Sequence, residues 1–172
     1  LSYGSSLISR RMLSNSISVM RRQRSELNLP ELPLYGRGDL SSLYSRMKPL
    51  STDEPLTLEK DGRSIEVTLH HAGHVAGAVS VTIRSEKQRV FFTGDILFND
   101  QRTLNGARPP LAEVDVLVTE TTRGHTSRDP NCQREAEIVN LLEATRKTLS
   151  NGGSVLLPIF ALGRMQEMLL IL

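Results

Sequence analysis

Residues 69–79 read LHHAGHVAGAV and place His74 in a glycine-rich loop directly after a predicted strand. Two further strings, VFFTGD at 90–95 and VLVTETTRG at 116–124, also run from an apolar segment into a polar loop. In layered α/β proteins, reactive side chains collect where strands end, because the loops there are free while the scaffold is rigid. The three strings therefore predict an α/β fold with a functional site at strand ends.

The strands around these strings follow from alternation and turn residues. Residues 56–60 and 64–71 predict a hairpin through the turn Asp61–Gly62, and residues 78–83 pair with 89–93. Residues 114–118 read as an apolar strand, which suits a sheet covered on both faces. Residues 154–157 read as another buried strand.

Helices are predicted at 6–24, at 40–47, from 129–131 to 149, and from near Gly163. The apolar side chains of the first helix should face inward: Leu7, Ile8, Met12, Leu13, Ile17 and Met20. In the third, the shared face holds Ile138, Leu141, Leu142 and Leu149. The change from strands to alternating helix and strand predicts a domain boundary near residues 121–124.

Composition sets the outer limits. Hydrophobic residues make up 38% and charged residues 23% of the 172 residues, as in a globular protein with a core. A net charge of +2 permits an anionic substrate without pointing to one. The single cysteine, Cys132, excludes an internal disulfide and fits a reducing compartment. No apolar run is long enough to span a bilayer, so no membrane association is expected.

The first 29 residues allow two interpretations. They hold five arginines, many serines and one acid, Glu26, a composition that resembles a mitochondrial transit peptide. They also fit an amphipathic helix with solvated arginines. The chain begins at Leu1 rather than Met and ends inside an apolar run, so we expect an internal fragment, which favours the helix.

His74 and Asp95 carry the chemistry that the residues alone suggest. Small residues flank His74, so a ligand or metal could approach closely. Asp95 follows Gly94 after an apolar strand, where a carboxylate is costly unless a cation pairs with it. Imidazole and carboxylate are natural zinc ligands, and a carboxylate can bridge two zincs. A solvated loop histidine remains the alternative.

Together with VLLPIFALGRMQEMLLIL at 155–172, the three strings resemble the β-CASP branch of the metallo-β-lactamase superfamily. The closest likeness is to the endonucleases of cleavage and polyadenylation and their prokaryotic RNA-processing relatives, and it covers residues 64–172. It implies an incomplete metallo-β-lactamase αββα sandwich over residues 1–122. The start of a β-CASP α/β domain would follow over residues 123–172.

The resemblance also implies roles for particular residues. His74 would bind one zinc of a two-zinc centre, and Asp95 would bridge both zincs. Glu120 would be a catalytic acid that orients a histidine supplied later in the chain. His71 has either a supporting role beside the metals or none, as an exposed strand-end histidine. His125 matches no ligand of the family.

Arg164 is the expected RNA contact. It follows the turn 161–163 at the start of a helix, where backbone amides favour phosphate, and its guanidinium could add a bidentate contact. The alternative is a salt bridge to Glu167 on the same helix. Arg123 is expected to be a surface arginine.

These observations predict a zinc-dependent RNA nuclease that hydrolyses phosphodiester bonds, with two Zn²⁺ per intact chain and single-stranded RNA as substrate. The family's HxHxDH signature is absent from this chain, so the fragment alone should be inactive. The protein is expected in the cytoplasm, or in the nucleus if its source is eukaryotic, as a homodimer or within an RNA-processing complex. Two rivals are a non-catalytic RNA-binding scaffold paralogue and a small-molecule metallo-hydrolase.

Overall fold

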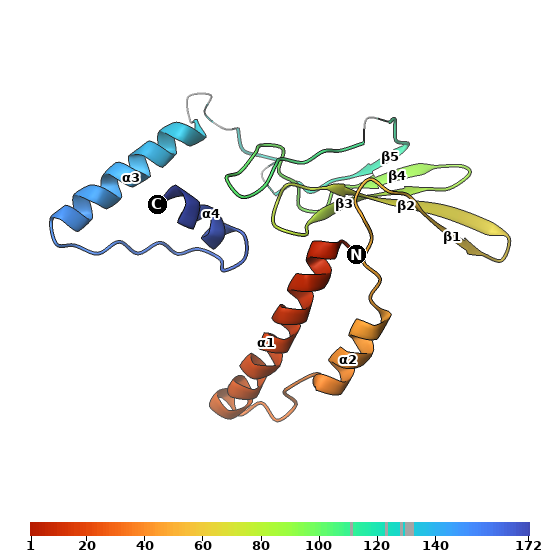
Figure 1. Ribbon diagram of the computed structural model, residues 1–172, viewed down its shortest axis with the longest axis horizontal. Helices are drawn as coiled ribbons and strands as arrows, with labels where there is room; N and C mark the ends of the chain where they lie inside the picture. Colours follow the sequence, from red (N-terminus) through yellow and green to blue (C-terminus); the bar gives the residue numbers. More distant parts are fainter. Residues whose placement is uncertain (111, 123, 128, 130–132) are drawn as a thin grey trace.

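A computed structural model describes residues 1–110, 112–122, 124–127, 129 and 133–172. Arg123, Cys132 and the predicted helix opening at 130–131 lie outside the described residues. The elements, shown in Figure 1, are α1 (Tyr3–Leu27), α2 (Arg37–Arg46), β1 (Leu56–Lys60), β2 (Arg63–His71), β3 (Val79–Arg84), β4 (Arg89–Phe92), β5 (Val116–Val118), α3 (Arg134–Ser150) and α4 (Arg164–Ile171).

The strands form one five-stranded sheet in the order β1-β2-β3-β4-β5. The first four strands pair antiparallel, and β5 pairs parallel with β4. Asp61 and Gly62 turn the β1–β2 hairpin with φ of 52° and 72°, as a tight two-residue turn requires. The predicted hairpin and the α/β class are both confirmed.

Strand direction brings the three sequence strings together. Because β2 and β4 both run antiparallel to β3, they run in the same direction, and β5 is parallel to β4. The C-terminal ends of β2, β4 and β5 therefore meet at one edge of the sheet. The loops that carry His74, Asp95 and Glu120 leave the sheet at this edge.

Helices α1 and α2 form a hairpin that projects from the sheet (Figure 1). Its core consists of Ile17, Met20 and Leu40. Leu7 and Met12 are 55% and 52% exposed, so the prediction that they face inward was wrong. At the N-terminus of α1, the Ser2 hydroxyl accepts a hydrogen bond from the Ser5 amide, which starts the helix earlier than the apolar pattern indicates.

Two predicted strands differ from the structure. Residues 116–118 of β5 are 40%, 56% and 46% exposed, so this strand is not covered on both faces. Residues 154–157 form no strand, and Leu156 is 90% exposed. An apolar run becomes a strand only beside a hydrogen-bonding neighbour, and the described residues offer none to this segment.

Helix α3 also departs from its prediction, because it has no buried residue and Leu149 is 57% exposed. Ile138, Leu141 and Leu142 are half-buried. Across the described ranges, no helix is long and apolar enough to cross a membrane.

Candidate functional site

His74 and Asp95, separated by 21 residues in sequence, face one another at the common strand edge. His74 Nε2 lies 3.9 Å from Asp95 Oδ2, and the side chains are 35% and 75% exposed. An imidazole and a carboxylate thus share an accessible position. The structure brings together the two residues that the sequence singled out as metal ligands.

Glu120 holds the turn that carries Asp95. Its carboxylate accepts hydrogen bonds from the Ile96 amide at 2.8 Å and from the Thr122 hydroxyl at 2.6 Å. These two bonds, the Thr122 hydroxyl most of all, lower the pKa of Glu120, and the nearby His74 adds to the effect. Glu120 is therefore an ionised acceptor at neutral pH, and it fixes the Asp95 turn by binding the amide of Ile96, the residue after Asp95.

The loop before His74 requires a glycine. Gly73 has a φ of 69°, and a β-carbon there would lie 2.3 Å from the Leu97 carbonyl oxygen. The two chain segments are held this close by a hydrogen bond from the Leu97 amide to the Ala72 carbonyl at 2.9 Å. The glycine thus allows the loop after β2 to pack against the loop after β4.

Gln101 joins this loop to helix α4. Its side-chain amide donates to the carbonyls of Gly73 at 2.7 Å and His74 at 3.1 Å, while its carbonyl oxygen accepts from Arg164 Nη1 at 3.0 Å. Gly163, with a φ of 82°, starts α4 so close to this loop that a β-carbon would lie 2.7 Å from Val75 Cγ1. The 161–164 turn and the His74 loop therefore form one packed unit.

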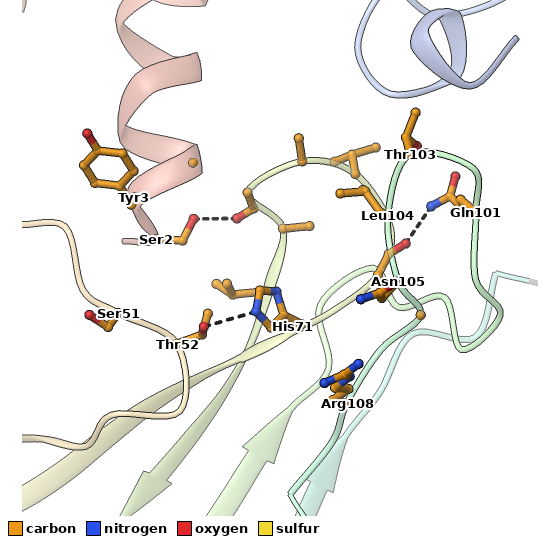
Figure 2. A pocket seen from close by; sticks show the side chains of 18 of the residues that line it. Ser2, Tyr3, Ser51, Thr52, His71, Gln101, Thr103, Leu104, Asn105 and Arg108 are labelled. Atoms are coloured by element: carbon orange, nitrogen blue, oxygen red, sulfur yellow. Dashed lines mark hydrogen bonds between the residues drawn. The ribbon is translucent and has the colours of Figure 1, made fainter. Parts of the chain in front are cut away.

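A cavity of about 720 Å³ lies beside this unit, between the N-terminus of α1, the 73–79 loop and residues 101–106. Figure 2 shows His71 on its wall, pointing toward Thr52. His71 Nε2 and Thr52 Oγ1 are 3.1 Å apart. Arg108 lines the same cavity, whereas His125 is exposed and lines a different cleft.

Glu167 anchors α4, whereas the sequence predicted for it only an alternative salt bridge to Arg164. It is 3% exposed and accepts hydrogen bonds from the Arg102 amide at 2.7 Å and from the Thr103 amide and hydroxyl at 2.9 and 2.8 Å. Arg134 of α3 forms its ion pair. The alternative salt bridge from Arg164 was therefore wrong. An acid within the apolar 165–172 run was the available signal, since a buried carboxylate needs partners.

No role was predicted for His70. It is 8% exposed, with Nδ1 3.0 Å from Asp53 Oδ1 and Nε2 2.9 Å from Thr82 Oγ1. Its ring also meets the edge of Phe91 at 6.0 Å between centroids. With both nitrogens engaged, His70 braces β2 against β3 and is not available as a ligand.

His74 and Asp95 are a donor pair of suitable chemistry for one zinc ion. At zinc–ligand distances of about 2.0–2.2 Å, two ligand atoms of a tetrahedral ion lie roughly 3.4 Å apart. The observed 3.9 Å is wider, so a small side-chain rotation would be needed for both atoms to bind one ion. Among the described residues, no group of three or more His, Cys, Asp or Glu side chains could hold a metal. The chain thus supplies two donors of suitable chemistry.

The chain is similar to several fungal endoribonucleases. It is 40% identical over 139 residues to endoribonuclease ysh1 of Schizosaccharomyces pombe, covering 81% of this chain and 17% of the relative. It is 38% identical over 165 residues to endoribonuclease YSH1 of Yarrowia lipolytica, covering 96% and 18%. With YSH1 of Saccharomyces cerevisiae the identity is 36% over 148 residues, covering 86% and 18%.

The chain therefore spans less than a fifth of the length of these relatives. No model of a protein family matches it. The alignment with the Yarrowia lipolytica relative covers 96% of the chain and therefore spans the strands and loops that meet at the His74–Asp95 edge. With its mixed sheet and helices, the chain belongs to the β-CASP group of the metallo-β-lactamase superfamily, as do its YSH1 relatives.

Proposed function

We propose that the protein is a zinc-dependent ribonuclease that hydrolyses phosphodiester bonds in single-stranded RNA. The observation that carries the proposal is the approach of His74 Nε2 to Asp95 Oδ2, 3.9 Å apart at the edge where three strands end. The relatives' name, endoribonuclease, supports internal cleavage and a role in RNA processing. The proposal concerns the protein with its full set of metal ligands.

His74, Asp95 and Glu120 have separate roles in this reaction. His74 and Asp95 would hold zinc, with Asp95 shared between two ions. When bound, a zinc pair activates water and stabilises charge on phosphate oxygens. Glu120 keeps the Asp95 turn in place through the Ile96 amide, and its lowered pKa keeps it an acceptor. An ionised acid in this state can orient an imidazole that protonates the leaving oxygen.

The proposal includes a division into a partial metallo-β-lactamase domain at 1–122 and the start of a β-CASP domain at 123–172. In support, the last strand of the sheet ends at Val118. The described residues after it form the helices α3 and α4 and no further strand. The α4 helix contacts the first part through Glu167 and Arg164. RNA would then enter between the two parts.

The substrate class can be tested directly on the purified full-length protein. We expect it to cut a labelled single-stranded RNA at internal positions and to leave a thioester and a lactone unhydrolysed. Denaturing gels and ester assays would measure both. Hydrolysis of the small esters without RNA cleavage would favour a small-molecule metallo-hydrolase. Tight RNA binding without any cleavage would favour a non-catalytic scaffold.

Arg164 is proposed as a backbone contact for the RNA. Its Nη1 donates to Gln101, and its remaining N–H groups are available to phosphate at the start of α4. We expect Arg164→Ala to weaken binding to all RNA sequences about equally. It should lower the slope of log affinity against log salt by about 0.7 to 1 unit, because one phosphate contact is lost.

Gln101→Ala provides the matched control for Arg164→Ala. It removes the hydrogen bond to Arg164, together with those to the Gly73 and His74 carbonyls, but leaves the guanidinium in place. The salt slope should therefore stay at the wild-type value. Fluorescence anisotropy at several salt concentrations measures both variants. If Arg164→Ala lowers thermal stability but keeps the wild-type salt slope, Arg164 is only a structural partner of Gln101.

A further inference from the structure

Basic charge is concentrated in the α1–α2 hairpin. Residues 1–50 hold eight arginines and lysines and three acids, whereas the whole chain holds 21 and 19. The remainder of the chain is therefore net negative. A net charge near zero for the whole chain conceals a positive hairpin attached to an acidic body.

A groove of about 430 Å³ runs between α1 and α2. Two arginines line it from opposite helices, Arg21 on α1 and Arg37 on α2, and both are exposed. Three hydroxyl side chains, Ser14, Ser18 and Ser41, share the lining. Guanidinium and hydroxyl groups are donors that suit phosphate oxygens.

The floor of the groove is apolar and buried. Ile17 and Leu40 line it and are 3% and 5% exposed as part of the hairpin core. The ring of Tyr44 also lines it, and Arg10 lies 4.7 Å from the centroid of that ring. The spacing of the two helices, and with it the placement of the two arginines, is therefore fixed by packing.

Among the residues that the structure describes, no acid forms an ion pair with Arg21 or Arg37. Asp39, the acid of α2, accepts a hydrogen bond from the Gly36 amide at 2.8 Å and so caps its own helix. Glu26 pairs with Arg22 at 3.7 Å. Neither Arg21 nor Arg37 has a side-chain hydrogen bond or ion pair with the described residues. Two unpaired guanidinium groups thus flank a groove that holds no counter-charge.

We infer that this groove binds the phosphodiester backbone of single-stranded RNA, outside the His74–Asp95 edge. The inference rests on the proposed function for the choice of RNA. The groove is far larger than one small anion needs, and its charges sit on two helices, which suits a repeating anion. Guanidinium and hydroxyl contacts to phosphate carry no sequence information, so binding through them is independent of sequence.

The groove is distant from the metal-binding edge but joined to it by α1. The hydroxyls of Ser2 and Ser5 donate to the Gly77 carbonyl, in the His74 loop, at 2.7 and 2.8 Å. Arg21 lies sixteen residues beyond Ser5 on the same helix, or about 24 Å at the rise of an α-helix. An RNA that reaches both places is held along one rigid element.

The test uses the full-length protein carrying Arg21→Ala and Arg37→Ala and a 20-nucleotide single-stranded RNA of mixed sequence. Losing two phosphate contacts should lower the salt slope by about 1.4 units and weaken binding roughly tenfold near physiological salt. Arg21→Lys with Arg37→Lys keeps the charge and should restore the slope. Zinc content and thermal stability should not change, because neither arginine has a partner in the fold.

Lys60→Ala with Arg63→Ala, on the exposed β1–β2 hairpin, removes the same charge elsewhere and should leave the slope unchanged. An equal decrease of the salt slope in both double variants would mean a general charge effect and would contradict RNA binding in the groove. A wild-type slope in the Arg21/Arg37 variant would overturn it as well. Binding is measured separately from cleavage. If the Arg21/Arg37 substitutions lower the salt slope but the wild-type protein cuts no RNA, the proposed function is contradicted and the RNA-binding groove is not.

Discussion

Asp95→Asn should reduce RNA hydrolysis by at least about a hundredfold and lower the zinc content of the full-length protein. Losing a partner that only supports a metal ligand already costs about 10- to 100-fold in affinity or activity, and a bridging ligand should exceed that. Asn keeps the size of the side chain but loses the charge that two cations would share. The Asp95 side chain is 75% exposed, so folding should be unaffected. Gel-based cleavage, metal analysis and circular dichroism measure the three effects.

The matched control is Asp61→Asn, the same chemical change in the exposed turn between β1 and β2. Asp61 has a φ of 52°, a conformation that asparagine also adopts readily. This variant should keep full activity and zinc. Wild-type turnover by a folded Asp95→Asn protein, with its zinc unchanged, would show that Asp95 is not a metal ligand.

Local chemistry explains which parts of the fold were predictable. The β1–β2 hairpin depends on Asp61 and Gly62, whose backbone preferences act within the turn itself. The predictions of a buried strand at 154–157 and of a β5 covered on both faces were wrong, because burial is decided by neighbours that are distant in sequence. An apolar run such as that around Leu156 reads the same whether or not another element covers it.

In the candidate site too, some residues were predictable from the sequence and others were not. His74 and Asp95 stand out because each follows a strand, and strand directions then bring them within 3.9 Å. Gln101 carries no such signal, since a glutamine in a polar loop becomes informative only when it spans two carbonyls and an arginine. Residues with the chemistry of metal ligands can be read from sequence, whereas the groups that position them emerge from loop packing.

Glu167→Ala should destabilise the docking of α4 by about 1–3 kcal/mol, the cost of leaving buried donors without an acceptor. The lost ion pair adds little, because Arg134 is 38% exposed and can regain water once its partner is gone. The substitution also leaves the amides of Arg102 and Thr103 without their acceptor. Hydrogen exchange at these two amides should rise sharply, and denaturant unfolding should report the loss of stability.

Glu167→Gln separates the charge of this residue from its size. Burial alone would raise the pKa of Glu167, but the hydrogen bonds from Arg102 and Thr103 and the charge of Arg134 outweigh it and lower the pKa below 4.5. A lowered pKa means that the unfolded chain binds the proton more readily. The stabilisation is therefore present above about pH 4.5 and disappears as the pH falls through the folded-state value. The difference in unfolding free energy between wild type and Glu167→Gln should shrink over this window. A difference that stays constant from pH 7 to pH 3 would show that the charge of Glu167 does not hold α4 in place.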